Sequence, residues 1–170
     1  MRAFRRSLPM ALLRAREAVM KTFMPHLRAN DMSPQQWRVL RALFDAREQG
    51  QEEVEMSYLA EKCHLLLPSL SRIVQLLQKR GLIQRRNSRA DMRRSMISLS
   101  DSGGELVKFM SVQSEARYEH ITRVFGYGKL ELLYELLEEL TEKLSEADIA
   151  DSDPRTEQLN ARSAGADRDD

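Results

Sequence analysis

The sequence predicts a mainly α-helical fold with one small β-hairpin. Apolar residues recur at helical spacing through most of the chain, Gly and Pro stand between these stretches, and the hydrophobic period changes to two in one place. The 170 residues include 42% hydrophobic and 31% charged residues, with only 7 Gly and 5 Pro. This composition is typical of an ordered protein, and the length indicates one domain, or one domain that carries extra arms.

Two helices are expected at the start of the chain. The first covers residues 7–28, where apolar side chains follow a helical period, and Pro25 marks its weakened end. The second begins at Ser33, whose side chain can cap exposed backbone N–H groups while Gln36 returns the bond, and it stops near Gly50. Both helices therefore have an apolar face and recognisable ends.

Two shorter helices and a hairpin follow. A third helix is expected over residues 54–64, and a fourth opens at Pro68 and ends at Gly81. One buried face of the fourth helix is formed by Leu70, Ile73, Val74 and Leu77. The period then changes to two over residues 82–86 and 95–99, which indicates a hairpin with a charged tip.

The C-terminal part is expected to be helical up to a tail. A long helix starts at residue 101, where Ser100 and Asp101 are cap candidates, and Gly126 and Gly128 separate it from a last helix that ends near residue 147. Residues 149–170 lack periodicity and are rich in Asp, Arg, Ala and Ser, so they are expected to form a disordered tail.

This order of elements is that of a winged helix-turn-helix lobe over residues 33–100, carried in a single domain over residues 1–148 by long helices at 7–28 and 101–147. The leucines of the long helices need a partner surface, so a symmetric homodimer is expected, with plain core packing of Leu133–Leu144 as the alternative. A dimer sets two recognition helices about 34 Å apart, which matches a palindromic duplex.

Charge is segregated along the chain although the formal net charge is only +1. Residues 69–94 hold eight Lys and Arg against one Asp, whereas residues 130–153 hold nine Asp and Glu against one Lys. A phosphate-binding surface on an otherwise neutral protein has this asymmetry. Basic runs are often plain solvated faces, but their combination with the helix-turn-helix order favours double-stranded DNA as the partner.

The fourth helix and the hairpin tip carry the candidate DNA contacts. On the helix they are Pro68, Ser69, Ser71, Arg72, Gln75 and Lys79, and on the wing they are Arg86, Arg89, Arg93 and Arg94. Arg72 can bond guanine in bidentate fashion, and the wing arginines can enter the minor groove or hold phosphates. Asp91, the one acid of this basic stretch, is expected to shape the wing through an ion pair with Arg93, or else to be a plain exposed turn residue.

Several short motifs point to a known family. They are Leu59-Ala60-Glu61, Leu70-Ser71-Arg72, Gly81-Leu82, and Asp91-x-Arg93 leading to Leu99-Ser100. Together they resemble the MarR (multiple-antibiotic-resistance-regulator) family of dimeric winged-helix regulators over about residues 12–144. Further stretches resemble regulators of homoprotocatechuate degradation operons: Leu12-Leu13-x-Ala15-Arg16-Glu17-Ala18, Gln35-Gln36-Trp37-Arg38 and Leu67-Pro68-Ser69-Leu70. The resemblance implies a sequence-specific repressor of an aromatic catabolic operon, relieved by an aromatic acid such as 3,4-dihydroxyphenylacetate.

The same resemblance implies a ligand pocket where the first and second helices meet. Arg16, Trp37 and Arg38 suit a small aromatic carboxylate there, because a guanidinium clamps a carboxylate and an indole packs on an aromatic ring. Core packing of Trp37 and surface ion pairs of the two arginines are the alternatives.

Other chemistries have weaker support in the sequence. The three histidines, His26, His64 and His120, fall on different segments, and no phosphate-binding glycine loop or nucleophile motif is present, so no enzyme, catalytic residue, cofactor or metal site is expected. Cys63 is expected to be buried and structural, with a redox-sensing regulator acting through it as an alternative. Another alternative is a protein-interaction module that docks an acidic partner. No apolar stretch reaches the roughly 20 residues of a membrane span, so the cytoplasm is the expected location.

Overall fold

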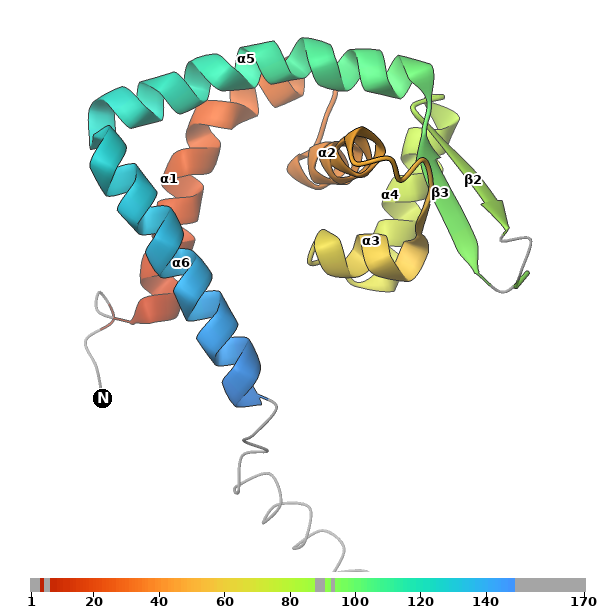
Figure 1. The fold of residues 1–170 in the computed structure, drawn as a ribbon. Helices are drawn as coiled ribbons and strands as arrows, with labels where there is room; N and C mark the ends of the chain where they lie inside the picture. The colour runs from red at the N-terminus through yellow and green to blue at the C-terminus, as the bar shows by residue number, and fades with distance from the viewer. Residues whose placement is uncertain (1–3, 5–6, 88–90, 93, 149–170) are drawn as a thin grey trace, which may run out of the picture. The chain divides into compact units, whose positions relative to one another are not determined.

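The computed structural model describes residue 4 and residues 7–87, 91–92 and 94–148, with side chains up to residue 145. The elements in chain order are α1 (Leu8–Ala29), α2 (Pro34–Glu48), β1 (Val54–Glu55), α3 (Met56–Lys62), α4 (Leu67–Lys79), β2 (Ile83–Asn87), β3 (Ser95–Leu99), α5 (Asp101–Phe125) and α6 (Tyr127–Asp148) (Figure 1). The chain forms two compact units, residues 1–120 and 121–170. The mainly α-helical, winged helix-turn-helix prediction is confirmed.

The wing is a small antiparallel sheet with the strand order β1-β3-β2. Strands β2 and β3 form the predicted hairpin, in which Ile83 pairs with Leu99 and Asn87 with Ser95. The prediction of a helix from residue 54 is wrong for its first two residues, because β1 pairs with β3 and places Val54 opposite Ile97. Helix α3 therefore starts two residues later than predicted.

The ends of α1 and α2 follow from their sequences. Ser33 accepts a hydrogen bond from the Gln36 N–H at 3.2 Å, and the Gln36 side chain accepts one from the Ser33 N–H at 2.8 Å, which confirms the predicted capping box. Helix α1 runs through Pro25 and ends at Ala29, one residue beyond the predicted end. An interior proline removes a backbone hydrogen bond and crowds the carbonyl four residues before it, yet α1 continues and buries Phe23, His26 and Leu27 around it.

The core of the first unit is built from the buried faces of α1 to α5 together with the sheet. Leu70, Val74 and Leu77 of α4 have no exposed surface, which confirms three of the four residues of its predicted buried face. Ile73, the fourth, is half-buried. Helix α4 ends as expected before Gly81, whose φ of +71° suits a residue without a Cβ atom.

Helix α5 begins very close to the wing. The Ser100 side chain accepts a hydrogen bond from the Gly103 N–H at 3.0 Å, as a helix cap does. A Cβ atom at Gly103 would lie 2.1 Å from the Leu82 carbonyl oxygen, so only glycine fits at this contact. The contact holds the start of α5 against the loop that follows α4.

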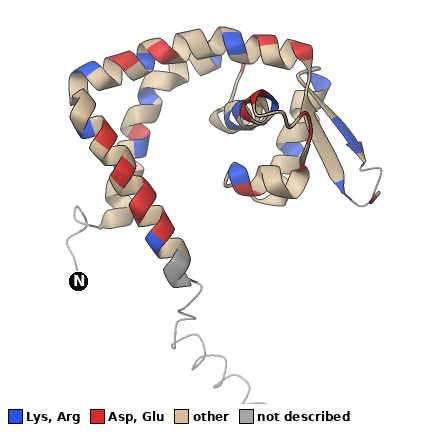
Figure 2. Ribbon diagram, viewed as in Figure 1, with Lys and Arg blue, Asp and Glu red and all other residues tan. Residues whose placement is uncertain are grey.

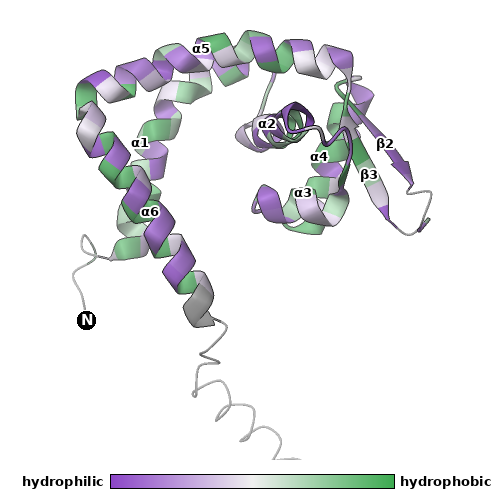
Figure 3. Ribbon diagram, in the orientation of Figure 1, coloured by the Kyte–Doolittle hydropathy of each residue, from purple (hydrophilic) through white to green (hydrophobic). Residues whose placement is uncertain are grey.

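Helix α6 in the second unit is amphipathic (Figure 3). Its leucines are largely exposed, with 54% of Leu136 and 56% of Leu144 accessible. Leu130 is the one apolar side chain of the described part of α6 that is buried. None of the helices that the structure describes is long and apolar enough to cross a membrane.

Candidate nucleic-acid interface and ligand pocket

The face of α4 opposite its buried stripe carries the predicted helix contacts together. Pro68, Ser69, Arg72, Gln75 and Lys79 are exposed, and Ser71 is half-buried. The N-terminus of α4 is also open, because Leu66 at the N-cap is 77% exposed and its side chain makes no capping bond. A helix with a polar, partly cationic face and an unobstructed N-terminus can enter the major groove of a duplex.

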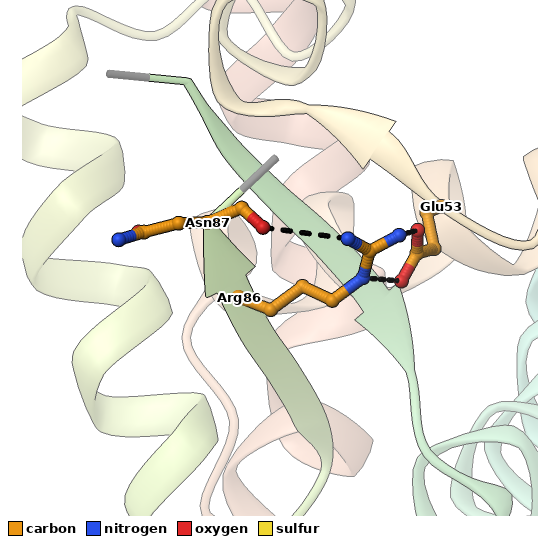
Figure 4. A network of polar contacts seen from close by, with 3 residues as sticks. All are labelled: Glu53, Arg86 and Asn87. Atoms are coloured by element: carbon orange, nitrogen blue, oxygen red, sulfur yellow. Dashed lines mark hydrogen bonds and ion pairs between the residues drawn. The ribbon is translucent and has the colours of Figure 1, made fainter. Parts of the chain in front are cut away.

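Two of the wing arginines proposed as DNA contacts have acidic partners in the structure. Arg86 forms a bidentate ion pair with Glu53, the residue before β1, and also donates to the Asn87 carbonyl oxygen at 3.3 Å (Figure 4). The hydrogen bonds that Arg86 donates to Glu53 raise the pKa of the Arg86 guanidinium above its ordinary value. In this arrangement a carboxylate faces the Arg86 charge that was assigned to DNA.

Arg94 is paired in a similar way. Its Nη1 atom lies 2.7 Å from Glu55 of β1, and its Nε atom lies 3.6 Å from Asp91. Asp91 thus contacts a wing arginine, as predicted for a wing-shaping residue, and the partner seen is Arg94. The expected partner Arg93 and the predicted DNA contact Arg89 lie outside the described residues. Strand β2, which carries Arg85 and Arg86, is coloured blue in Figure 2.

A pocket of about 370 Å³ opens between α1, α2 and α5 of the first unit. Its lining includes all three predicted ligand residues, Arg16, Trp37 and Arg38. The remaining lining residues are Val19, Met20, Phe23, Leu27, Pro34, Arg41, Asp45 and Tyr118. Aromatic and aliphatic walls with a few cationic groups suit a small aromatic acid.

Each pocket arginine has a different set of partners. Arg16 pairs with the neighbouring Glu17 at 2.6 Å on an exposed part of α1. Arg41 lies over the Trp37 ring, 5.9 Å from its centroid, while its Nε atom is buried without a hydrogen-bond partner. Arg38 donates from Nη1 to the Cys63 carbonyl oxygen at 2.7 Å.

Sequence reasoning missed Arg41 and Tyr118. Arg41 lies one helical turn after Trp37, so the spacing within α2 could have placed both on the pocket face. Tyr118 comes from α5 and packs edge-on against Phe23 with the ring centroids 5.1 Å apart. No local sequence pattern indicates that α5 packs on α1, so Tyr118 could not be placed at the pocket from the sequence.

Comparison with known proteins bears on the function of these two features. A profile of the MarR family matches residues 30–94. The chain is 36% identical to the HTH-type transcriptional regulator FarR of Neisseria gonorrhoeae, over 79% of this chain and 88% of that protein. It is 35% identical to the homoprotocatechuate degradative operon repressor of Escherichia coli, over 78% of this chain and 86% of that protein.

The chain belongs to the MarR family. The family predicted from the sequence motifs is therefore confirmed, and with it the expectation of a transcriptional regulator rather than an enzyme. A crystal structure of the regulator NadR in complex with 4-hydroxyphenylacetate is also similar, with a TM-score of 0.70 and 34% identity, covering 80% of this chain and 96% of NadR.

Two buried polar residues of this MarR-family chain join α1 to α5. His26 of α1 lies 3.2 Å from the Ser114 hydroxyl of α5, measured from its Nε2 atom. Burial and the positive charge of Arg117 lower the pKa of His26, so it is neutral in the folded protein near pH 7.

Cys63 is fully buried, and its thiol donates to the Arg38 carbonyl oxygen at 3.9 Å. Burial raises the pKa of the Cys63 thiol, while the Arg38 charge acts in the opposite direction. A buried thiol held in its protonated form is a poor nucleophile. These features favour the structural interpretation of Cys63 over a redox sensor.

Proposed function

We propose that this MarR-family regulator is a repressor that binds a palindromic DNA duplex as a homodimer and is released by a small aromatic carboxylate. In this proposal it acts in the cytoplasm and controls an operon for the breakdown of aromatic compounds. The observation that carries the proposal is the combination, in one unit, of an exposed cationic recognition helix and an arginine-lined aromatic pocket.

The DNA part of the proposal rests on α4 and the wing. Ser69 and Ser71 are small enough for close approach to base edges, and Arg72 is exposed and can reach a guanine in bidentate fashion. Lys79, about two turns after Arg72 on the same face of α4, and the wing arginines supply contacts to phosphates. Arg86 and Arg94 belong to the proposed surface on condition that phosphates compete with Glu53 and Glu55 for them.

The dimer part of the proposal rests on apolar helix faces that are exposed in the described part of the chain. On α1 the exposed apolar side chains are Leu8, Leu12, Leu13 and Val19, and on α6 they include Leu132, Leu133, Leu136 and Leu144. Contiguous exposed apolar surface on helices is typical of an interface. A symmetric dimer uses the same face twice and presents two recognition helices to the two halves of a palindrome.

The effector part rests on the pocket and on two relatives. A pocket with an indole, a phenol and three guanidinium groups can bind the ring and the carboxylate of an arylacetate. One similar protein is a homoprotocatechuate operon repressor, and another was crystallised with 4-hydroxyphenylacetate. An arylacetate such as 3,4-dihydroxyphenylacetate is therefore the proposed effector of this chain.

Fluorescence of Trp37 tests the effector directly. The chain has a single Trp, and it lines the pocket, so a bound ring should change the emission. We expect saturable changes with 3,4-dihydroxyphenylacetate and 4-hydroxyphenylacetate and weaker binding in Arg41→Met. Lack of any change with arylacetates, confirmed by calorimetry, would remove the effector from the proposal.

Arg72→Ala tests the DNA surface. Losing a bidentate base contact costs about 1–3 kcal/mol, which corresponds to roughly 5- to 150-fold weaker binding of a preferred duplex. Lys108→Ala is the matched control, because Lys108 is an exposed cation on α5, away from the proposed surface. Equal duplex affinities of Arg72→Ala and the parent chain in an electrophoretic mobility-shift assay would refute the placement of Arg72 at the DNA bases.

A further inference from the structure

Arg38 is shared by the ligand pocket and the turn that leads into α4. Arg38 is one of the residues that line the pocket, together with Trp37. Its guanidinium donates to the Cys63 carbonyl oxygen at 2.7 Å, and the Cys63 thiol donates back to the Arg38 carbonyl oxygen at 3.9 Å. Two hydrogen bonds in opposite directions therefore join α2 to the end of α3.

The carbonyl that Arg38 contacts is one of the acceptors left over at a helix C-terminus. Helix α3 ends in a closed turn, in which the His64 N–H bonds the Glu61 carbonyl and the Leu65 N–H bonds the Ala60 carbonyl, both at 2.9 Å. These bonds do not use the Cys63 carbonyl oxygen, which instead accepts a hydrogen bond from Arg38. A positive charge at this end also suits the helix dipole.

The turn is short and conformationally restricted. His64 has a φ of +48°, a left-handed conformation that non-glycine residues seldom adopt, and α4 begins at Leu67 after only His64, Leu65 and Leu66. A displacement of the Cys63 carbonyl is therefore passed to the first turn of α4 with little chain to absorb it. That first turn carries Ser69, a proposed base contact.

The other two pocket arginines lack this connection within the described part of the chain. Arg16 pairs with Glu17 of its own helix, and Arg41 bonds Ser111 and Asp45 at 3.5 and 3.7 Å. A ligand on either one meets a side chain that is anchored away from the α3–α4 turn. This difference provides a matched comparison between Arg38 and Arg16.

We infer that Arg38 is the positioning residue that couples effector binding to DNA binding, an inference that rests on the proposed function. Its guanidinium has two alternative acceptors, the Cys63 carbonyl and the carboxylate of a pocket ligand. A carboxylate that takes Nη1 leaves the Cys63 carbonyl without its donor and frees the start of α4 to shift. Because linkage is reciprocal, a duplex that fixes α4 weakens ligand binding by the same factor.

The test measures this coupling in the full chain. A duplex is first selected by the parent chain from a randomised pool, and its Kd is measured by fluorescence anisotropy with and without saturating 4-hydroxyphenylacetate. We expect about 10-fold weaker duplex binding with the ligand in the parent chain, inside the about 5- to 150-fold range of allosteric couplings. In Arg38→Met the ratio should fall below about 2-fold while the duplex still binds.

Two controls separate coupling from occupancy. Arg16→Met should weaken ligand binding, as measured by titration of Trp37 fluorescence. It should keep the parent coupling ratio once the ligand is saturating. The uncharged analogue 4-hydroxyphenylacetamide should occupy the parent pocket, at higher concentration, with a coupling ratio near one. Both results follow if the carboxylate acts through Arg38 rather than through filling the pocket.

The outcomes distinguish the inference from the function on which it rests. If folded Arg38→Met still binds both the duplex and the arylacetate and keeps the coupling ratio of the parent chain, the role of Arg38 is overturned and the proposed function stays intact. A parent chain that binds no duplex, or no arylacetate, overturns the proposed function and the inference with it. If circular dichroism shows that Arg38→Met does not fold, Arg38→Lys takes its place, and an unchanged ratio there overturns the inference.

Discussion

The substitution Gly103→Ala probes the contact that joins α5 to the wing. A Cβ atom at residue 103 would lie 2.1 Å from the Leu82 carbonyl oxygen and 2.9 Å from a methyl carbon of Leu99. The first neighbour is backbone, so it cannot turn away as a flexible side chain would. The start of α5 and the loop at Leu82 must therefore separate by about 1.3 Å to restore an ordinary van der Waals distance of 3.4 Å.

The expected cost follows from three contributions. Overpacking of this kind costs about 1–3 kcal/mol. The separation also weakens the hydrogen bond from the Ser100 N–H to the Leu82 carbonyl, 3.1 Å long, which contributes about 1 kcal/mol. Alanine regains about 1 kcal/mol through its helix propensity. The net loss is about 2 kcal/mol of unfolding free energy, or roughly a 30-fold change in the ratio of folded to unfolded protein.

Urea unfolding followed by circular dichroism measures this loss at a fixed protein concentration. Gly128→Ala is the matched control, because its added Cβ meets no other described part of the chain within 4 Å beyond its own helix, and it sits in the first turn of α6. The control should be as stable as the parent chain or more stable by about 0.5 kcal/mol. Equal stabilities of Gly103→Ala and the parent chain would show that α5 does not approach Leu82 as closely as the structure has it.

Two further predictions concern the wing and the buried histidine. Glu53→Gln removes the carboxylate that pairs with Arg86, so Arg86 becomes available to a phosphate. The slope of log K for duplex binding against log salt should then steepen by about 0.9 for each protomer, measured by anisotropy between about 50 and 200 mM salt. An unchanged slope would mean that Arg86 gains no phosphate contact. The pKa of His26 is lowered on folding, so the unfolded chain binds a proton first as the pH falls below about 6.5, and the unfolding free energy decreases from there. His26→Gln should flatten that decrease in urea unfolding at about pH 7 and pH 5, whereas equal decreases would rule out a contribution from His26.

Local signals in the sequence were sufficient for most helix ends and for the hairpin. The capping box at Ser33 and the left-handed Gly81 are properties of a few adjacent residues, so they can be read without knowing the fold. Strand β1 was missed because two residues give no period, and it exists only because the free edge of β3 pairs with Val54 and Glu55. Its formation depends on a contact far away in the sequence.

The same missing strand explains why the acidic partners in the wing were not foreseen. The charge count over residues 69–94 did not include Glu53 and Glu55, which precede that stretch. Glu53 and Glu55 reach Arg86 and Arg94 because β1 lies in the same sheet, and that placement could not be derived before β1 was known. Three pocket residues were found from the resemblance, whereas Tyr118 required the packing of α5 on α1.

The measurement that bears most directly on the central claim is selection of duplexes from a randomised pool by the full chain. The proposed function predicts enrichment of an inverted repeat with half-site centres about one helical turn, roughly 34 Å, apart, and loss of that enrichment in Arg72→Ala but not in Lys108→Ala. Recovery of no preferred sequence, or the same sequence with Arg72→Ala, would contradict the assignment of α4 as the DNA-reading helix.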